Sequence, residues 1–105
     1  MDDPEIMEDI RAFVAERDWE PFHDPKNLAM AVVSEAGELA AELRWVASEE
    51  SDAFCRRPDA RSRIEDEVAD VAITLLMLCD RTGIDLNAAI RVKLVKNREK
   101  YPAPR

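Results

Sequence analysis

The sequence predicts an all-α fold, a bundle of four helices assembled as a homo-oligomer. The 105 residues include only two glycines, and no stretch of strand length alternates apolar and polar residues. Apolar residues instead recur at helical spacing through several long segments. Apolar residues make up 47% of the chain, which is enough for a core. A domain this small nevertheless gains much stability from a partner subunit.

The first two helices have clear start and stop signals. The first begins at the Asp-Asp-Pro segment of residues 2–4 and ends before RDWEPFHDP (17–25). The two prolines of that segment push their preceding residues out of the α region. Asp24 is the expected cap of the second helix, with Pro25 at its first position, and this helix should run to about Val46.

The second half of the chain predicts two more helices after a polar connection, SEESDAFCRRP (48–58). Asp59 is the expected cap of the third helix, which ends at Thr82-Gly83. Asp85 starts the fourth helix, and YPAP stops it. We find no internal repeat and no linker, so residues 1–105 are expected to form one domain centred on the second and third helices.

Charge and composition exclude several classes of partner. The formal net charge is −8, which argues against a nucleic-acid polymer or an anionic membrane surface. The longest apolar run, Val71–Cys79, is about half the length needed to cross a bilayer. The first ten residues are acidic, unlike a secretory signal, and the two cysteines lack ligand or disulfide spacing. We therefore expect a cytoplasmic protein.

Two acidic pairs stand out within the apolar sequence. Glu35 and Glu38 lie in SEAGELAAE on the second helix, and Glu67 and Asp70 repeat the same spacing in EDEVADV on the third. Four carboxylates that converge without partners repel one another, so they either take up protons or bind cations. Glu42 is more easily explained as a surface charge or as a supporting group.

Hard divalent cations are the simplest partners for such a cluster. Mg²⁺, with Mn²⁺ as a substitute, prefers oxygen ligands and often binds substrate phosphates as well. Zinc fits poorly, and a di-iron centre normally needs two Glu-x-x-His motifs, whereas His23 is the only histidine. The alternative is that the acids form a solvated helix face. Gly37, between them, either admits a close backbone or ligand or is simply tolerated at about 1 kcal/mol.

The chain resembles the all-α nucleoside triphosphate pyrophosphohydrolases of the MazG superfamily, and most of all their dCTP pyrophosphatase type. The resemblance rests on FVAERDWEPFHDPKNL, SEAGELAAELRW, EDEVADV and DLNAAIRVKLVKNREKYP. It implies hydrolysis of a nucleoside triphosphate to the monophosphate and pyrophosphate. It also implies that the four acids bind Mg²⁺, and that Glu38 doubles as the general base through a water molecule.

The same resemblance implies a set of substrate contacts. They are Trp19, His23, Asn27, Trp45, Thr74, Lys93, Asn97 and Arg98. Trp45 lies seven residues beyond Glu38, and hence is expected on the same helical side, close to the metal. Asn27 could instead support the helix start. Thr74 stands where dimeric relatives often carry tyrosine, so base and sugar preference stay open.

Two alternatives remain at this point. The chain could be a non-catalytic helical module whose acids bind a basic partner, or the same kind of enzyme acting on dUTP or a broad set of triphosphates. As an enzyme, it is expected to form a homodimer or a dimer of dimers, because one chain offers few helices to enclose a nucleotide.

Overall fold

The computed structural model describes residues 3–104, and every regular element in that range is helical. In chain order the elements are α1 (Pro4–Glu16), the 3₁₀ turn η1 (Glu20–Phe22), α2 (Pro25–Leu43), the 3₁₀ turn η2 (Ser48–Glu50), α3 (Ser51–Arg56), α4 (Pro58–Thr82) and α5 (Leu86–Lys100). The predicted all-α fold class is confirmed. No helix within this range is both long and apolar enough to span a membrane.

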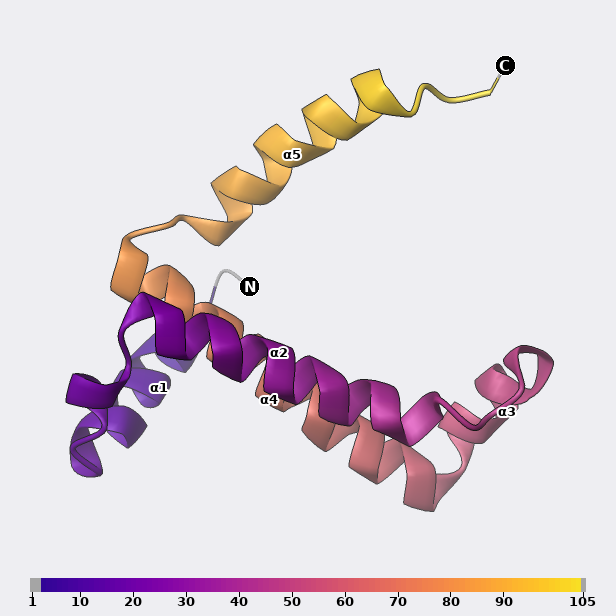
Figure 1. Ribbon diagram of the computed structural model, residues 1–105, viewed down its shortest axis with the longest axis horizontal. Coiled ribbons are helices and arrows are strands. Elements are labelled where there is room, and N and C mark those ends of the chain that lie inside the picture. Colours follow the sequence, from indigo (N-terminus) through magenta and orange to yellow (C-terminus); the bar gives the residue numbers. More distant parts are fainter. Residues whose placement is uncertain (1–2, 105) are drawn as a thin grey trace.

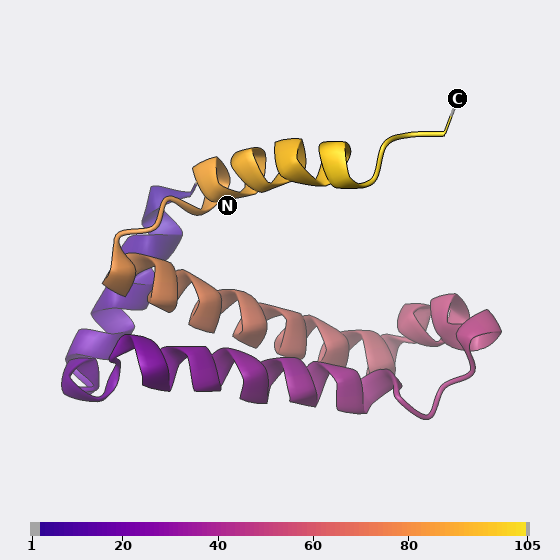
Figure 2. The same cartoon turned by 45° about the horizontal axis from the view of Figure 1, so that its top comes forward.

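The centre of the fold is the pair formed by α2 and α4. The two helices run antiparallel and lie side by side over most of their length (Figure 2). α1 crosses the end of the pair where α2 begins and α4 ends, and α3 lies at the opposite end (Figure 1). Ile10, Val14 and Leu28 are buried where α1 meets the pair.

Local capping chemistry sets most helix ends as the sequence predicts. The side chain of Asp24 accepts a hydrogen bond from the Asn27 backbone N–H at 2.7 Å, and Asp85 accepts one from Ala88 at 3.0 Å. Both acids therefore satisfy backbone donors that lack partners inside the helix. Gly83 ends α4 in the left-handed conformation, with φ of 74°.

Three boundaries differ from the sequence prediction. The expected connection 48–58 contains the short helix α3, so there are five helices among the described residues rather than four. Arg57, not Asp59, is the residue that precedes α4, because Pro58 takes the first helical position. α2 ends at Leu43 instead of about Val46, in a turn that the Val46 N–H closes on the Leu43 carbonyl.

The single chain does not close around a core. Its radius of gyration is 16.7 Å, compared with about 13 Å for a compact domain of 100 residues. α5 projects away from α2 and α4 (Figures 1 and 2), and its apolar side chains Ile90, Val92, Leu94 and Val95 are exposed. On α2, Val33 is also 66% exposed. These apolar surfaces are not covered by any other part of residues 3–104.

Candidate metal centre

The four predicted ligands meet in the middle of the α2–α4 pair. One carboxylate oxygen from each of Glu35, Glu38, Glu67 and Asp70 lies within 4.8 Å of the others. The spacing of three residues places both members of a pair on one helix face, and the antiparallel packing turns the two faces toward each other. The sequence therefore predicted this juxtaposition correctly.

The cluster is electrostatically unsatisfied. Oε2 of Glu35 and Oε2 of Glu67 are buried and have no hydrogen-bond partner. Burial raises the pKa of Glu35 above its ordinary value, with further contributions from hydrogen bonding and repulsion by Glu38. Burial, followed by repulsion from Glu38, raises the pKa of Glu67 in the same direction. Both carboxyls are thus harder to ionise than usual while no cation is present.

These observations fit a hard divalent cation. Two buried carboxylate oxygens without donors, beside two further carboxylates, supply the oxygen ligands and the negative charge that Mg²⁺ or Mn²⁺ requires. No histidine or cysteine belongs to the group, so the donor set does not suit zinc. Glu38 is an exposed residue, so its carboxylate is open to water.

An ion pair joins the two helices one turn from the cluster. Nε of Arg63 on α4 donates to Oε1 of Glu42 on α2 at 2.9 Å. The sequence indicated a surface or supporting role for Glu42 but did not indicate one for Arg63. Their spacing was nevertheless a usable signal, because Arg63 lies one turn before Glu67 and Glu42 one turn after Glu38. The pair helps to fix the register of the two helices beside the acids.

Gly37 faces open space within the chain. A Cβ atom built on Gly37 would meet no atom within 4 Å. The close approach that could explain a glycine here is therefore not made by another part of the described chain. A second subunit or a ligand remains as the possible neighbour.

The first group of predicted substrate residues lies at the start of α2. Trp19 packs edge-on against His23, with ring centroids 6.2 Å apart, and against Phe13 at 5.5 Å. The Asn27 side chain donates to the Phe22 carbonyl at 2.9 Å and is therefore used in holding the helix start. This contact favours the supporting role that the sequence left open for Asn27.

Trp45 lies at the other end of α2, two residues beyond its last residue, Leu43, and it is 86% exposed. The Arg44 guanidinium lies 5.3 Å from the centre of the Trp45 ring. Between Asn27 and Leu43 the axis of α2 rises by about 24 Å. The two aromatic groups of one chain are therefore far apart.

The remaining predicted contacts are not assembled at the cluster within one chain. Lys93, Asn97 and Arg98 lie on α5, which projects away from α2 and α4 (Figure 2). Thr74 lies one turn after Asp70 on α4, and its hydroxyl donates to the carbonyls of Asp70 at 3.1 Å and Val71 at 3.0 Å. Thr74 is close to the acids, but its hydroxyl proton is already used within the helix.

Comparison with known proteins adds independent findings. The model of the MazG-like family matches residues 30–105. The chain is 42% identical to dCTP pyrophosphatase 1 of Bos taurus over 100 residues, and 43% identical to that of Homo sapiens over 101 residues. These matches cover 91% and 92% of this chain but 59% of each relative. The chain therefore spans less than two thirds of their length.

A solved structure shares the whole fold. A pyrophosphatase from Archaeoglobus fulgidus, 37% identical in sequence, superposes with a TM-score of 0.88. The match covers 95% of this chain and 92% of that chain. The helical arrangement around the acids is thus similar to that of a known pyrophosphatase.

Proposed function

The chain belongs to the MazG-like family, and we propose that it hydrolyses dCTP or a modified dCTP to the monophosphate and pyrophosphate. The observation that carries this proposal is the convergence of four carboxylates, two of which hold buried oxygens without partners. The similarity to proteins named dCTP pyrophosphatase supports the reaction and the base. Water would add across the bond between the α- and β-phosphates.

Each acid has a proposed role. Glu35, Glu67 and Asp70, together with Glu38, would hold Mg²⁺, with Mn²⁺ as a substitute. The cation would neutralise triphosphate oxygens and polarise the attacking water. The carboxylate of Glu38, which is exposed, would accept the proton of that water.

The base and the outer phosphates need groups that one chain keeps apart. Trp19 and His23 lie at one end of α2, Trp45 lies at the other, and α5, which carries the cations, projects away from α2 and α4. A nucleotide with its phosphates at the central acids can extend toward only one end of α2. We therefore propose that the pocket is shared between subunits of a homodimer or a dimer of dimers. The exposed apolar side chains of α2 and α5 support such an assembly.

Glu38→Gln provides the most direct test of the chemistry. Loss of a general base that also binds the metal should lower kcat by at least 10²-fold, while the helical content stays unchanged. Pyrophosphate release measures the activity, and circular dichroism measures the helices. Glu65→Gln is a matched control, because it neutralises an exposed glutamate of α4 that lies outside the cluster. Wild-type turnover in Glu38→Gln would contradict the assignment.

The change in Tm on adding nucleotide and metal distinguishes an enzyme from a non-catalytic helical module. Binding to the folded state raises its stability by RT ln(1 + [L]/Kd), so Mg²⁺ plus substrate should raise Tm more than either does alone. A non-catalytic module that binds a basic partner would respond to neither. Product analysis over a panel of dCTP, dUTP, modified pyrimidines and ribonucleotides then identifies the substrate. Equal turnover of all these nucleotides would contradict a preference for dCTP and would indicate a broad substrate specificity.

A further inference from the structure

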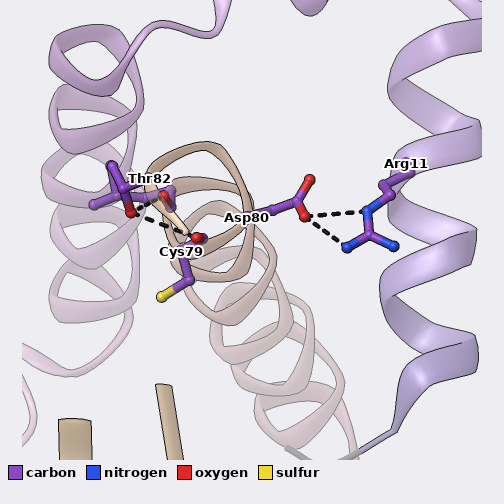
Figure 3. Close-up of polar contacts among 5 residues, drawn as sticks. Arg11, Cys79, Asp80 and Thr82 are labelled. Carbon is purple, nitrogen blue, oxygen red and sulfur yellow. Dashed lines mark hydrogen bonds and ion pairs between the residues drawn. The ribbon is translucent and has the colours of Figure 1, made fainter. Parts of the chain in front are cut away.

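Two arginine contacts tie α1 and η1 to the C-terminal end of α4. Nε and Nη2 of Arg11 donate to the same Oδ1 atom of Asp80, at 3.1 Å and 2.6 Å (Figure 3). Nη1 of Arg81 donates to the backbone carbonyl of Glu20 at 3.4 Å. Neither contact touches the acidic cluster, because Asp80 lies ten residues beyond Asp70, about 15 Å along the helix.

The interface that these contacts cross is loosely packed. A cavity of about 380 Å³ lies on one side of Arg11, between α1, η1, α2 and α4. A groove of about 700 Å³ lies on its other side, between α1, α4 and the start of α5. Arg11 and Asp80 line both spaces, so the ion pair stands between two hollows. Two side chains of α1, Ile10 and Val14, are buried at this interface beside the ion pair.

The direction of α1 determines where the aromatic segment lies. The Trp19 backbone N–H donates to the Val14 carbonyl at 3.2 Å, and its indole packs edge-on against Phe13 of α1. His23 in turn packs against Trp19. Asp18, which joins α1 to this segment, has a positive φ of 54°, so the turn there is sharply defined. A shift of α1 is thus passed on to Trp19 and His23.

We propose that Arg11, Asp80 and Arg81 are positioning residues that hold the Trp19–His23 segment in its substrate-binding place. This inference rests on the proposed function, since that function assigns Trp19 and His23 to the substrate. The three residues act through α1 and η1 and do not touch the reacting atoms. Their loss should weaken substrate binding and leave the chemical step at the acids nearly unchanged.

The test combines kinetics with the fluorescence of Trp19. Asp80→Asn should raise KM by up to roughly fivefold, the effect of losing one well-formed surface ion pair, while kcat stays within about twofold. Trp45→Phe leaves Trp19 as the only tryptophan. In that background, Asp80→Asn should make Trp19 fluorescence easier to quench with acrylamide. Arg11→Lys keeps the charge but loses the two-donor geometry, so both readouts should change less, in the same direction.

Asp59→Asn is the matched control. It removes the ion pairs of another exposed carboxylate of α4, with Arg57 at 3.0 Å and with Arg63 at 3.9 Å, about 30 Å from Asp80 along the same helix. Neither KM nor Trp19 quenching should change in this variant. Combining Arg11→Asp with Asp80→Arg should restore both readouts in part, because the pair is rebuilt with its charges exchanged.

The outcomes are distinguishable from a failure of the proposed function. If the unmodified protein releases no pyrophosphate, the proposed function fails, and the quenching of Trp19 alone decides the structural connection. Unchanged quenching in both Asp80→Asn and Arg11→Lys would overturn the inference. So would a fall in kcat with an unchanged KM, since that pattern places the effect on the chemical step.

Discussion

Replacing one cluster acid by its amide should stabilise the protein whenever divalent cations are absent. Glu35→Gln removes one of four neighbouring carboxylates, and the oxygen that it replaces is buried without a partner. The new amide can donate hydrogen bonds to the remaining carboxylates. Most substitutions at a packed position destabilise a protein. A gain in stability here would therefore be a specific sign of electrostatic repulsion.

The expected gain follows from the geometry. At 4.8 Å, each ionised neighbour of Glu35 costs about 0.9 kcal/mol at the dielectric constant of water and about 3.5 kcal/mol at an effective value of 20. The cluster is partly open to solvent, so the smaller value applies. We expect a net gain of about 1 kcal/mol, which raises Tm by about 4–8 °C in a domain of this size.

Thermal unfolding at pH 8, monitored by circular dichroism, measures the change in Tm both without and with Mg²⁺. In EDTA the variant should unfold at a higher temperature than the wild type. In Mg²⁺ the wild type should gain stability through binding, and the variant should gain much less. Glu42→Gln is the matched control on the same helix, because Glu42 is paired with Arg63. This control should show no gain in EDTA and should keep its response to Mg²⁺.

Two results would refute the reasoning. A lower Tm of Glu35→Gln in EDTA would mean that the carboxylates do not repel one another in the folded protein. An undiminished response to Mg²⁺ would mean that any metal binds elsewhere. Either result would remove the electrostatic basis for the metal site.

Three further predictions concern stability. The raised pKa values of Glu35 and Glu67 mean that the folded, metal-free state holds more protons than the unfolded state just above the ordinary carboxyl range. The free energy of unfolding should therefore fall as pH rises through that window. The fall should be smaller in the double variant Glu35→Gln with Glu67→Gln. Urea titrations at several pH values measure the free energy of unfolding. Leu28→Ala, at a residue only 2% exposed, should lower the free energy of unfolding by about 2–4 kcal/mol, and a loss below about 1 kcal/mol would contradict the burial of this side chain. Asp24→Ala should cost about 1 kcal/mol in urea unfolding by removing the cap of α2, whereas Asp24→Asn should cost little.

Local chemistry explains what the sequence could predict. Asp24, Asp85 and Gly83 act within one turn of their own helices, so their roles can be read without the rest of the fold. The position of the four cluster acids could also be predicted from local spacing. Their i, i+3 spacing fixes one face of each helix, and only one antiparallel packing was needed to bring the faces together.

The errors arise where the outcome depends on competition or on distant contacts. α3 has only six residues, too short for a periodic signal. Both Pro58 and Asp59 suit a helix start, and the fixed φ of proline decided the position. The direction of α5 depends on the short joint after Gly83, and no pattern in the sequence indicates the geometry of that joint.

That joint has a mechanical consequence. Only Ile84 and Asp85 separate the left-handed Gly83 from α5, a helix about 22 Å long. A rotation of about 10° at the joint swings the far end of α5, with its arginine and lysine side chains, by about 4 Å. A small change in backbone angles at the joint therefore produces a large displacement at the far end of α5. The position of these cations relative to α2 and α4 is therefore sensitive to small changes at Ile84 and Asp85.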